Sequence, residues 1–282
     1  MSETPVKRAF VVGWPIKHSR SPIIHGYWLK SFGLSGSYER LAVEPGAFPA
    51  FAASVGEDGI VGANVTLPHK QAAFAACDVT TDVATSLGAV NTIWREDGLL
   101  KGDNADVAGF LANLDEGATG WDASHGTALV LGAGGAARAI CYGLLQRGFR
   151  RVAVANRTLS HAQDLASHFG ERVVALGREA APDDIAGADV IVNTTSLGMV
   201  GQPPLFLDLT PAQTDAVVAD LVYVPLETEL ILAARRRGLR AVGGLGMLLH
   251  QAVNGFEHWF GVRPTVDAEL RALVEADVRR SQ

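Results

Sequence analysis

The segment from Thr127 to Ala139 joins an apolar run to a glycine-rich turn and the start of a predicted helix. Gly132 permits a tight turn, Gly134 lets the backbone approach a phosphate, and Ala137 allows the helix to pack closely on the strand. The first turn of such a helix also offers free N–H groups and the positive end of the helix dipole. The pattern predicts a site for a dinucleotide pyrophosphate, although an ordinary strand-to-helix turn would also satisfy it.

A second predicted strand, residues 151–155, completes a βαβ unit with the helix expected at about 136–147. The end of this strand should meet the adenosine ribose, where NAD sites have an acidic residue. This chain has Asn156, Arg157 and Thr158 instead. A guanidinium would pair with a 2′-phosphate that a carboxylate would repel, so the segment predicts NADP rather than NAD. The alternative is that Arg157 is merely solvated and that Asn156 or Thr158 only caps the next helix.

Two serines lie in the loop that follows the predicted strand at 9–12. Pro22 suits the first position of a helix, with Ser21 as its N-cap and Ser19 just before it. Two hydroxyls beside open helix N–H groups could hold a carboxylate. Residue types alone leave open whether Ser21 is only a cap and Ser19 only a loop residue.

The same arrangement recurs after the apolar run at 59–65, where Asn64 and Thr66 precede a helix started by Pro68. This places Lys70 near the first turn. An ammonium group there meets the unfavourable end of the helix dipole, which suits a lysine that exchanges a proton. A plain surface lysine is the alternative.

Asp106 lies in a glycine-bounded segment, residues 102–109, before another predicted helix, and Asn91 follows an earlier strand start. A buried pair of Lys70 and Asp106 would position a proton donor and stabilise charge that develops on a carbonyl oxygen. Asp106 could equally be a helix N-cap. The polar residues 193–195 lie at the end of a predicted strand, where doubly wound sheets place ligands, or form only a turn.

Length, composition and net charge restrict the class of protein to which this chain can belong. The chain has 282 residues, 48% hydrophobic and 19% charged, which predicts two domains of a soluble α/β protein. The net charge of −6 supplies no basic face for nucleic acid or an anionic membrane, which leaves a small-molecule partner. The two cysteines are far apart and no histidine and carboxylate cluster has ligand spacing, so we expect neither a disulfide nor a metal. No secretory segment and no apolar run of about 18 residues is found, which predicts a cytoplasmic protein.

Short strands alternate with helical segments along the chain, which predicts α/β layers. The expected strands are 9–12, 38–43, 59–65, 89–94, 127–131, 151–155, 172–176, 188–192, 216–222 and 240–242. Residues 114–126 are rich in Gly, Asp, Ala and Ser and should lead into the nucleotide-binding domain. Beyond Gly243, helices are expected across 247–256 and 266–276, and they could return to the first domain.

Together these segments resemble the shikimate dehydrogenases, in the same order and over nearly the whole chain. The matching blocks are residues 13–22, 64–70, 88–92, 102–110, 132–139, 156–158, 193–199, 220–230 and 244–252. The chain departs from the family pattern at Gly26, Ala105 and Gly243, and none of these removes a catalytic group. Ala105 deletes a hydroxyl close to the substrate, which bears on the choice between shikimate and quinate. His161 stands where some relatives have a second basic residue for the 2′-phosphate.

The resemblance implies NADP-dependent, reversible reduction of 3-dehydroshikimate to shikimate in the biosynthesis of chorismate and aromatic amino acids, with Lys70 and Asp106 as the catalytic pair. It implies an α/β fold with a Rossmann-type NADP-binding domain, residues 113–246, and a discontinuous substrate-binding domain, residues 1–112 and 247–282, in a monomer or homodimer. The implied substrate contacts are Ser19, Ser21, Asn64, Thr66, Lys70, Asn91, Asp106, Tyr223 and Gln251. The expected cofactor contacts are Gly132, Gly134, Gly135, Ala136, Asn156, Arg157, Thr158, Thr194, Ser196, Met199 and Gly246.

Two other functions fit parts of the sequence. A quinate/shikimate dehydrogenase that uses NAD would share the blocks, but Arg157 opposes NAD and the pair of serines favours shikimate. A non-catalytic NADP-binding protein would keep the glycine turn and lose Lys70 or Asp106. Both residues are present.

Overall fold

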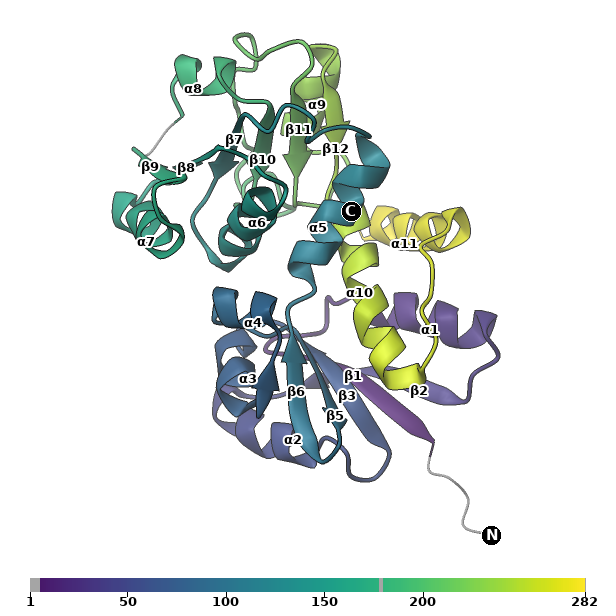
Figure 1. Cartoon of the computed structure of the whole chain (residues 1–282). Helices are drawn as coiled ribbons and strands as arrows, with labels where there is room; N and C mark the ends of the chain where they lie inside the picture. The colour runs from purple at the N-terminus through teal and green to yellow at the C-terminus, as the bar shows by residue number, and fades with distance from the viewer. Residues whose placement is uncertain (1–5, 178–179, 282) are drawn as a thin grey trace. The chain divides into compact units, whose positions relative to one another are not determined.

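The computed structural model describes residues 6–177 and 180–281. They form two compact units: residues up to 105 with 251–274, and residues 106–250 with those from 275 on. Figure 1 labels the elements. The first division falls at the start of α5 (Asp106–Gly117), whereas the sequence placed a boundary at 112/113. Residues 114–117 of the segment expected to lead into the nucleotide-binding domain form the end of α5, in which Phe110 and Leu114 bury an apolar face.

The first unit contains a six-stranded mixed sheet with the order β2-β1-β3-β5-β6-β4. Its strands are β1 (Lys7–Gly13), β2 (Gly36–Ala42), β3 (Ile60–Val65), β4 (Val79–Thr80), β5 (Thr92–Glu96) and β6 (Leu99–Asp103). Strands β2, β1 and β3 are parallel, and β5 is antiparallel to both β3 and β6. The helices of the N-terminal part are α1 (Ser21–Ser31), η1 (Pro45–Ala47), α2 (Phe48–Ser54), α3 (Lys70–Ala76) and α4 (Asp82–Leu87).

The β5–β6 hairpin corrects the sequence prediction, which extended a strand over 89–94 and left 102–109 as a loop. Asp97 (φ 54°) and Gly98 (φ 79°) make a two-residue turn in which both residues have positive φ. Asp-Gly is a strong hairpin signal, because both positions of such a turn favour residues that tolerate the left-handed region. The signal was in the sequence and marks β6, which the strand predictions had missed.

The second unit contains a six-stranded parallel sheet with the order β12-β11-β10-β7-β8-β9. Its strands are β7 (Thr127–Leu131), β8 (Arg151–Ala155), β9 (Val173–Leu176), β10 (Val190–Asn193), β11 (Val217–Asp220) and β12 (Arg240–Val242). Counted from β7, this is the order 3-2-1-4-5-6 of a Rossmann fold. The remaining helices are α6 (Gly135–Gln146), α7 (Leu159–Phe169), α8 (Pro182–Ala186), α9 (Glu229–Arg236), α10 (Leu245–Phe260) and α11 (Ala268–Arg280). The predicted α/β fold class is confirmed.

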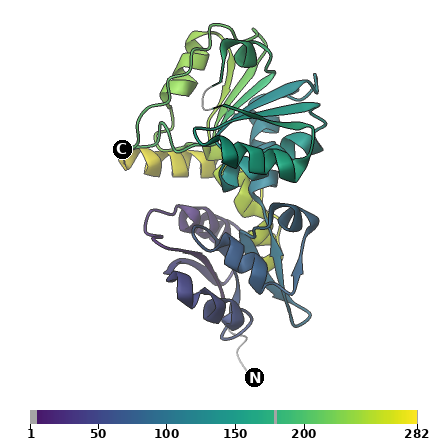
Figure 2. The ribbon, with the colours of Figure 1, turned by 90° about the vertical axis from the view of Figure 1, so that its left-hand side faces the viewer.

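Helices cover both faces of this second sheet. Along β7, Ala128 and Val130 pack into one apolar cluster with α6 and α7, while Leu129 and Leu131 pack into another with α9. In Figure 2 the strands lie between α6 and α7 (teal) on one side and α9 (green) on the other. A parallel sheet covered on both faces needs apolar residues throughout each strand, which is the composition of these strands.

In the part of the chain that the structure describes, no helix is long and apolar enough to cross a membrane. Among the same residues, no three His, Cys, Asp or Glu side chains come together where they could hold a metal ion.

An aromatic cluster in the first unit encloses His25 of α1. The imidazole stacks on Tyr38 of β2, with ring centroids 3.9 Å apart, and lies 5.9 Å from the ring of Phe256 and 5.5 Å from that of Trp259 on α10. Neither imidazole nitrogen has a hydrogen-bond partner among the described residues. Burial lowers the pKa of His25 to about 3, and the nearby side chain of Asn64 opposes this shift only in part.

The buried imidazole should make the protein sensitive to acid. Because the folded-state pKa lies below the ordinary value of 6.5, His25 takes up a proton in the unfolded chain first as the pH falls. We therefore expect His25 to lower the free energy of unfolding by about 1.6 kcal/mol between pH 6.5 and pH 5. Urea unfolding at both pH values, followed by tryptophan fluorescence, measures the change. In His25→Phe the drop in the free energy of unfolding between the two pH values should be smaller by this amount. In the control His161→Gln, at an exposed site, the drop should match that of the unmodified protein. A drop in His25→Phe as large as in the unmodified protein would contradict the assignment.

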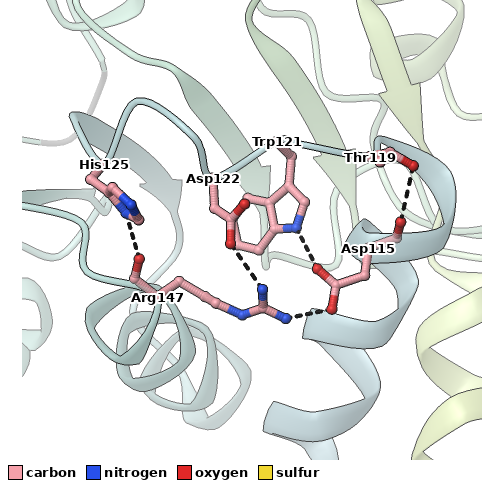
Figure 3. Close-up of polar contacts among 6 residues, drawn as sticks. All are labelled: Asp115, Thr119, Trp121, Asp122, His125 and Arg147. Atoms are coloured by element: carbon pink, nitrogen blue, oxygen red, sulfur yellow. Dashed lines mark hydrogen bonds and ion pairs between the residues drawn. The ribbon is translucent and has the colours of Figure 1, made fainter.

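Arg147, just after α6, joins α6 to α5 and to the loop before β7 (Figure 3). Its guanidinium forms ion pairs with Asp115 and, at 2.9 Å, with Asp122. It also lies over the indole of Trp121, 5.7 Å from the ring centroid, and Trp121 Nε1 donates to Asp115 Oδ1 at 2.9 Å. His125 Nδ1 lies 2.7 Å from the Arg147 carbonyl oxygen. Asp106, the first residue of α5, therefore belongs to a helix whose other end is fixed by a charged network.

We expect Arg147→Ala to lower the free energy of unfolding by about 1–2 kcal/mol, more than an isolated surface ion pair contributes. The substitution leaves Asp115 and Asp122 without their shared cation and removes the contact with Trp121. Arg263→Ala is the matched control, because its ion pair with Glu257 is formed by an arginine that is 61% exposed. Urea unfolding of both variants measures the difference; equal small losses would show that the network adds nothing.

Candidate active site

The glycine-rich turn follows β7 and opens α6. Gly132 has φ +106°, and a Cβ at this position would lie 2.6 Å from Thr194 Oγ1, so only glycine fits. Gly134 is the N-cap residue of α6 and provides no side-chain cap. A Cβ built on Gly134 or Gly135 meets nothing within 4 Å. Space and uncapped N–H groups therefore coincide at the start of α6, as phosphate binding requires.

A cavity of about 720 Å³ in the second unit begins at this turn. Gly132 lines it together with Asn156 and Arg157, the residues predicted to meet the ribose. Beyond them the wall becomes apolar and includes Ile185 and Phe206, and Phe206 is 79% exposed at its rim. The lining thus offers the glycine turn, a guanidinium and an apolar wall, which match the pyrophosphate, 2′-phosphate and adenine of NADP.

The segment after β8 leads into α7 without a side-chain hydrogen bond from the N-cap residue. Thr158 is at the N-cap position of α7, but its side chain makes no cap hydrogen bond. Asn156 Nδ2 donates instead to the Thr158 carbonyl oxygen at 2.8 Å. Arg157 is exposed and lines the cavity. The capping alternative left open by the sequence is therefore not what the structure shows.

A buried polar network holds the loop after β10. Asn193 Oδ1 accepts hydrogen bonds from the backbone N and the hydroxyl of Thr195, at 3.0 and 2.7 Å. Asn193 Nδ2 donates to Asp220 Oδ1 at 2.9 Å, and the Thr228 hydroxyl donates to Asp220 Oδ2 at 2.6 Å. Burial raises the pKa of Asp220, while these hydrogen bonds oppose the shift. The network links the ends of β10 and β11, so residues 193–195 do more than form a local turn.

This loop contributes Thr195 and Ser196 to the cavity. The sequence prediction named Thr194 in place of Thr195. The Thr194 hydroxyl instead donates to the Leu131 carbonyl oxygen at 2.8 Å, which fixes the loop against β7. Several other predicted cofactor or substrate residues of this unit do not line the cavity: Gly134, Gly135, Ala136, Thr158, Met199, Tyr223 and Gly246. At Gly246 a Cβ would lie 1.9 Å from Asn113 Oδ1, so this glycine is required for the packing of α10 on α5.

In the first unit, Ser19 and Ser21 lie side by side at the start of α1. The prediction that Ser21 is the N-cap is wrong: α1 begins at Ser21, and Arg20 occupies the cap position without a side-chain cap bond. Ser19 Oγ accepts from the backbone N of Ser21 at 3.4 Å and lies 3.3 Å from Ser21 Oγ. Because Ser19 Oγ accepts the backbone N–H of Ser21, the first residue of α1, the Ser21 hydroxyl is not used to cap the helix.

The antiparallel pairing of β5 with β6 positions Asn91. Its backbone N donates to the Asp103 carbonyl oxygen at 2.9 Å. Its Oδ1 accepts from the backbone N of Ala105 at 2.8 Å and from the Thr92 hydroxyl at 2.9 Å. Thr92 Oγ1 also accepts from Asn64 Nδ2 at 3.3 Å. The structure therefore brings the predicted residues Asn64 and Asn91 together through Thr92, which the sequence did not indicate as a site residue.

Lys70 is the first residue of α3 and is half-buried. The preceding His69 is buried, with Nε2 2.7 Å from the Val43 carbonyl oxygen, and it stacks on Phe48. This contact fixes the start of α3. Asp106 is the half-buried first residue of α5 and belongs to the second unit, while Lys70 belongs to the first.

Two further predicted residues belong to the first unit. Thr66 follows β3, and its backbone N donates to the Val12 carbonyl oxygen at 2.9 Å. Gln251 lies on α10 and is half-buried. The first unit thus contains the two serines, the two amides, Thr66, Lys70 and Gln251.

Three family models match successive parts of the chain. They are the shikimate dehydrogenase substrate binding domain over residues 11–93, shikimate / quinate 5-dehydrogenase over 116–200, and the shikimate 5'-dehydrogenase C-terminal domain over 244–273. The shikimate dehydrogenase (NADP(+)) of Azorhizobium caulinodans is 58% identical over 273 residues, which cover 97% of each protein.

Solved structures resemble this fold over nearly its full length. The quinate dehydrogenase from Corynebacterium glutamicum in complex with NAD has a TM-score of 0.87 at 31% identity and covers 97% of this chain and 100% of that one. The shikimate 5-dehydrogenase from Thermus thermophilus in complex with NADP(H) and shikimate has a TM-score of 0.82 at 36% identity, with 98% and 100% covered. With these matches, and with the glycine turn and Arg157 lining one cavity, the chain belongs to the shikimate dehydrogenase family.

Proposed function

We propose that this protein catalyses the NADP-dependent, reversible reduction of 3-dehydroshikimate to shikimate, a step of chorismate biosynthesis. The observation that carries the proposal is the cavity in which the Gly132 turn and Arg157 lie together. A guanidinium rather than a carboxylate at this position favours the 2′-phosphate of NADP. The 58% identical relative, named an NADP(+) enzyme, supports the same cofactor.

The residues of the first unit would bind the substrate. Ser19 and Ser21 would hold its carboxylate, because two adjacent hydroxyls can donate to both oxygens. The ring hydroxyls would be bound by Asn64, Thr66, Asn91 and Gln251, and by Asp106 and Tyr223 of the second unit. These assignments follow the family pattern and the grouping of the serines and amides in one unit.

The chemistry divides between cofactor and protein. NADPH, when bound, supplies the hydride. Lys70 and Asp106 would act as a pair that provides a proton to the carbonyl oxygen and stabilises the negative charge that develops there. In the reverse direction the same pair would remove the proton from the substrate hydroxyl.

We also propose which domain binds the substrate and which binds NADP. We assign substrate binding to residues 1–112 and 247–282, and NADP binding to residues 113–246. The second assignment is supported by a cavity whose lining lies wholly within the second compact unit. The net charge of −6 favours a small-molecule partner over nucleic acid. We place the protein in the cytoplasm, as a monomer or homodimer.

The test is the absorbance of reduced nicotinamide during turnover by the purified protein. Shikimate and quinate are each supplied with NADP and with NAD. We expect reduction largely confined to shikimate with NADP. Comparable turnover of quinate or NAD would instead identify a quinate/shikimate dehydrogenase, and no turnover in any combination would refute the proposed enzyme activity.

A further inference from the structure

Tyr38 makes a buried hydrogen bond to one of the proposed substrate ligands. Its side chain extends from β2, and the residue is 6% exposed. The Tyr38 hydroxyl donates to Asn64 Oδ1 across 2.5 Å. Burial raises the pKa of the phenol well above its ordinary value, so the hydroxyl keeps its proton for donation. The stacked ring of His25, 3.9 Å away, holds the phenol in place.

The length of this bond determines which end of the Asn64 amide faces Tyr38. The oxygen and nitrogen ends of an amide have nearly the same shape, so hydrogen bonding alone distinguishes them. A separation of 2.5 Å fits O–H···O, whereas N–H···O bonds are longer, about 2.7–3.2 Å. The oxygen of Asn64 is therefore the atom against Tyr38, and the NH₂ group is at the other end.

The rest of the chain of hydrogen bonds agrees with this orientation. Asn64 Nδ2 donates to Thr92 Oγ1 at 3.3 Å, and the Thr92 hydroxyl donates onward to Asn91 Oδ1. Asn91 Oδ1 also accepts from the backbone N of Ala105. The oxygens of both amides accept hydrogen bonds from donors of the protein. Both amides are thus held with the oxygen against the protein.

We infer that Tyr38 is a positioning residue that orients Asn64 so that its N–H group, rather than its oxygen, is offered to a ring hydroxyl of the substrate. The inference rests on the proposed function, because it takes Asn64 as a substrate ligand. The second N–H of Asn64 donates to the Asn91 carbonyl oxygen at 3.5 Å, the longer of the two bonds from Nδ2, and this is the contact that a substrate hydroxyl would replace. The recognised hydroxyl must then accept from Asn64, which leaves its own proton for another partner.

Tyr38→Phe tests the inference, because it removes only the hydroxyl. We expect the KM for shikimate to rise about tenfold while kcat and the KM for NADP stay within about twofold, since binding and not chemistry is affected. Calorimetric titration with shikimate should show the same weakening. Tyr142→Phe, which removes a phenol hydroxyl in the second unit, is the matched control and should leave every constant unchanged.

A double-variant cycle separates positioning from a general structural role. If Tyr38 acts through Asn64, adding Tyr38→Phe to Asn64→Ala should change the KM for shikimate by less than about twofold. A full tenfold further rise would overturn the inference. A second variant, Asn64→Asp, keeps an oxygen for Tyr38 and replaces the N–H donor with an acceptor, so shikimate binding should weaken more than tenfold. Unchanged binding in this variant would also overturn it.

The two proposals fail in different ways. If the unmodified protein does not turn over shikimate, the proposed function is wrong and the inference falls with it. If the unmodified protein is active and the Tyr38→Phe variant binds shikimate as tightly as the unmodified protein, only the inference is wrong.

Discussion

Lys70→Ala is expected to lower kcat for shikimate oxidation by about three orders of magnitude while leaving the affinity for NADP within about twofold. The substitution removes the proposed proton carrier and the positive charge that stabilises the reacting oxygen. It leaves the glycine turn and Arg157 untouched, because these belong to the other compact unit. Steady-state kinetics gives kcat, and a fluorescence titration with NADPH gives the cofactor affinity.

Lys30→Ala is the matched control for loss of a lysine charge, since Lys30 is exposed in the last turn of α1. It should retain full activity. The pairing with Asp106 is tested by combining Lys70→Ala with Asp106→Asn. Residues that act as a unit give a combined loss well below the product of the single losses. Equal losses of turnover and of NADPH binding in Lys70→Ala would refute the catalytic role.

Arg157→Ala is expected to raise the KM for NADP about 50-fold while the KM for NAD changes less than about twofold. Only NADP has the 2′-phosphate, and the guanidinium is the group in the cavity lining that can pair with it through two parallel hydrogen bonds. The increase should be smaller at high salt, because Arg157 is exposed and its charge is screened. Initial rates with each cofactor at two salt concentrations measure both effects.

Arg151→Ala is the matched control, since Arg151 is exposed at the opposite end of the same strand, β8. It should leave the preference between the cofactors unchanged. A similar increase in KM for NADP and NAD in Arg157→Ala would show that this arginine contributes general binding rather than selection of the 2′-phosphate.

Some errors of the sequence-based prediction have identifiable causes. Polar residues at 102–106 indicate a loop, but Asp97-Gly98 forms the hairpin turn that places Leu99–Asp103 in β6, a strand absent from the prediction. Ser21 was predicted to cap α1, but the Ser19 side chain accepts the Ser21 N–H in its place. Competition between neighbouring hydroxyls for one donor depends on loop conformation, which residue types do not specify.

The sequence by itself determined the features that depend on local backbone chemistry. The alternation of apolar runs with glycine turns predicted the fold class, and the family resemblance was confirmed by whole-length relatives. Gly132 could be recognised from its neighbours, since the need for a residue without Cβ arises within one strand–turn–helix segment. Local sequence also placed Arg157 at the end of β8.

Only the tertiary structure decided which side chains meet. The donor for Asn64 is Tyr38, 26 residues earlier, and its acceptor Thr92 is 28 residues later. These partners are set by the pairing of β1 with β2, β1 with β3, and β3 with β5. The same strand pairing brings the ends of β7, β8 and β10 to one cavity edge. Hydrogen bonds act over about 3 Å, so a shift of one residue in register would exchange every partner, and no local pattern fixes that register.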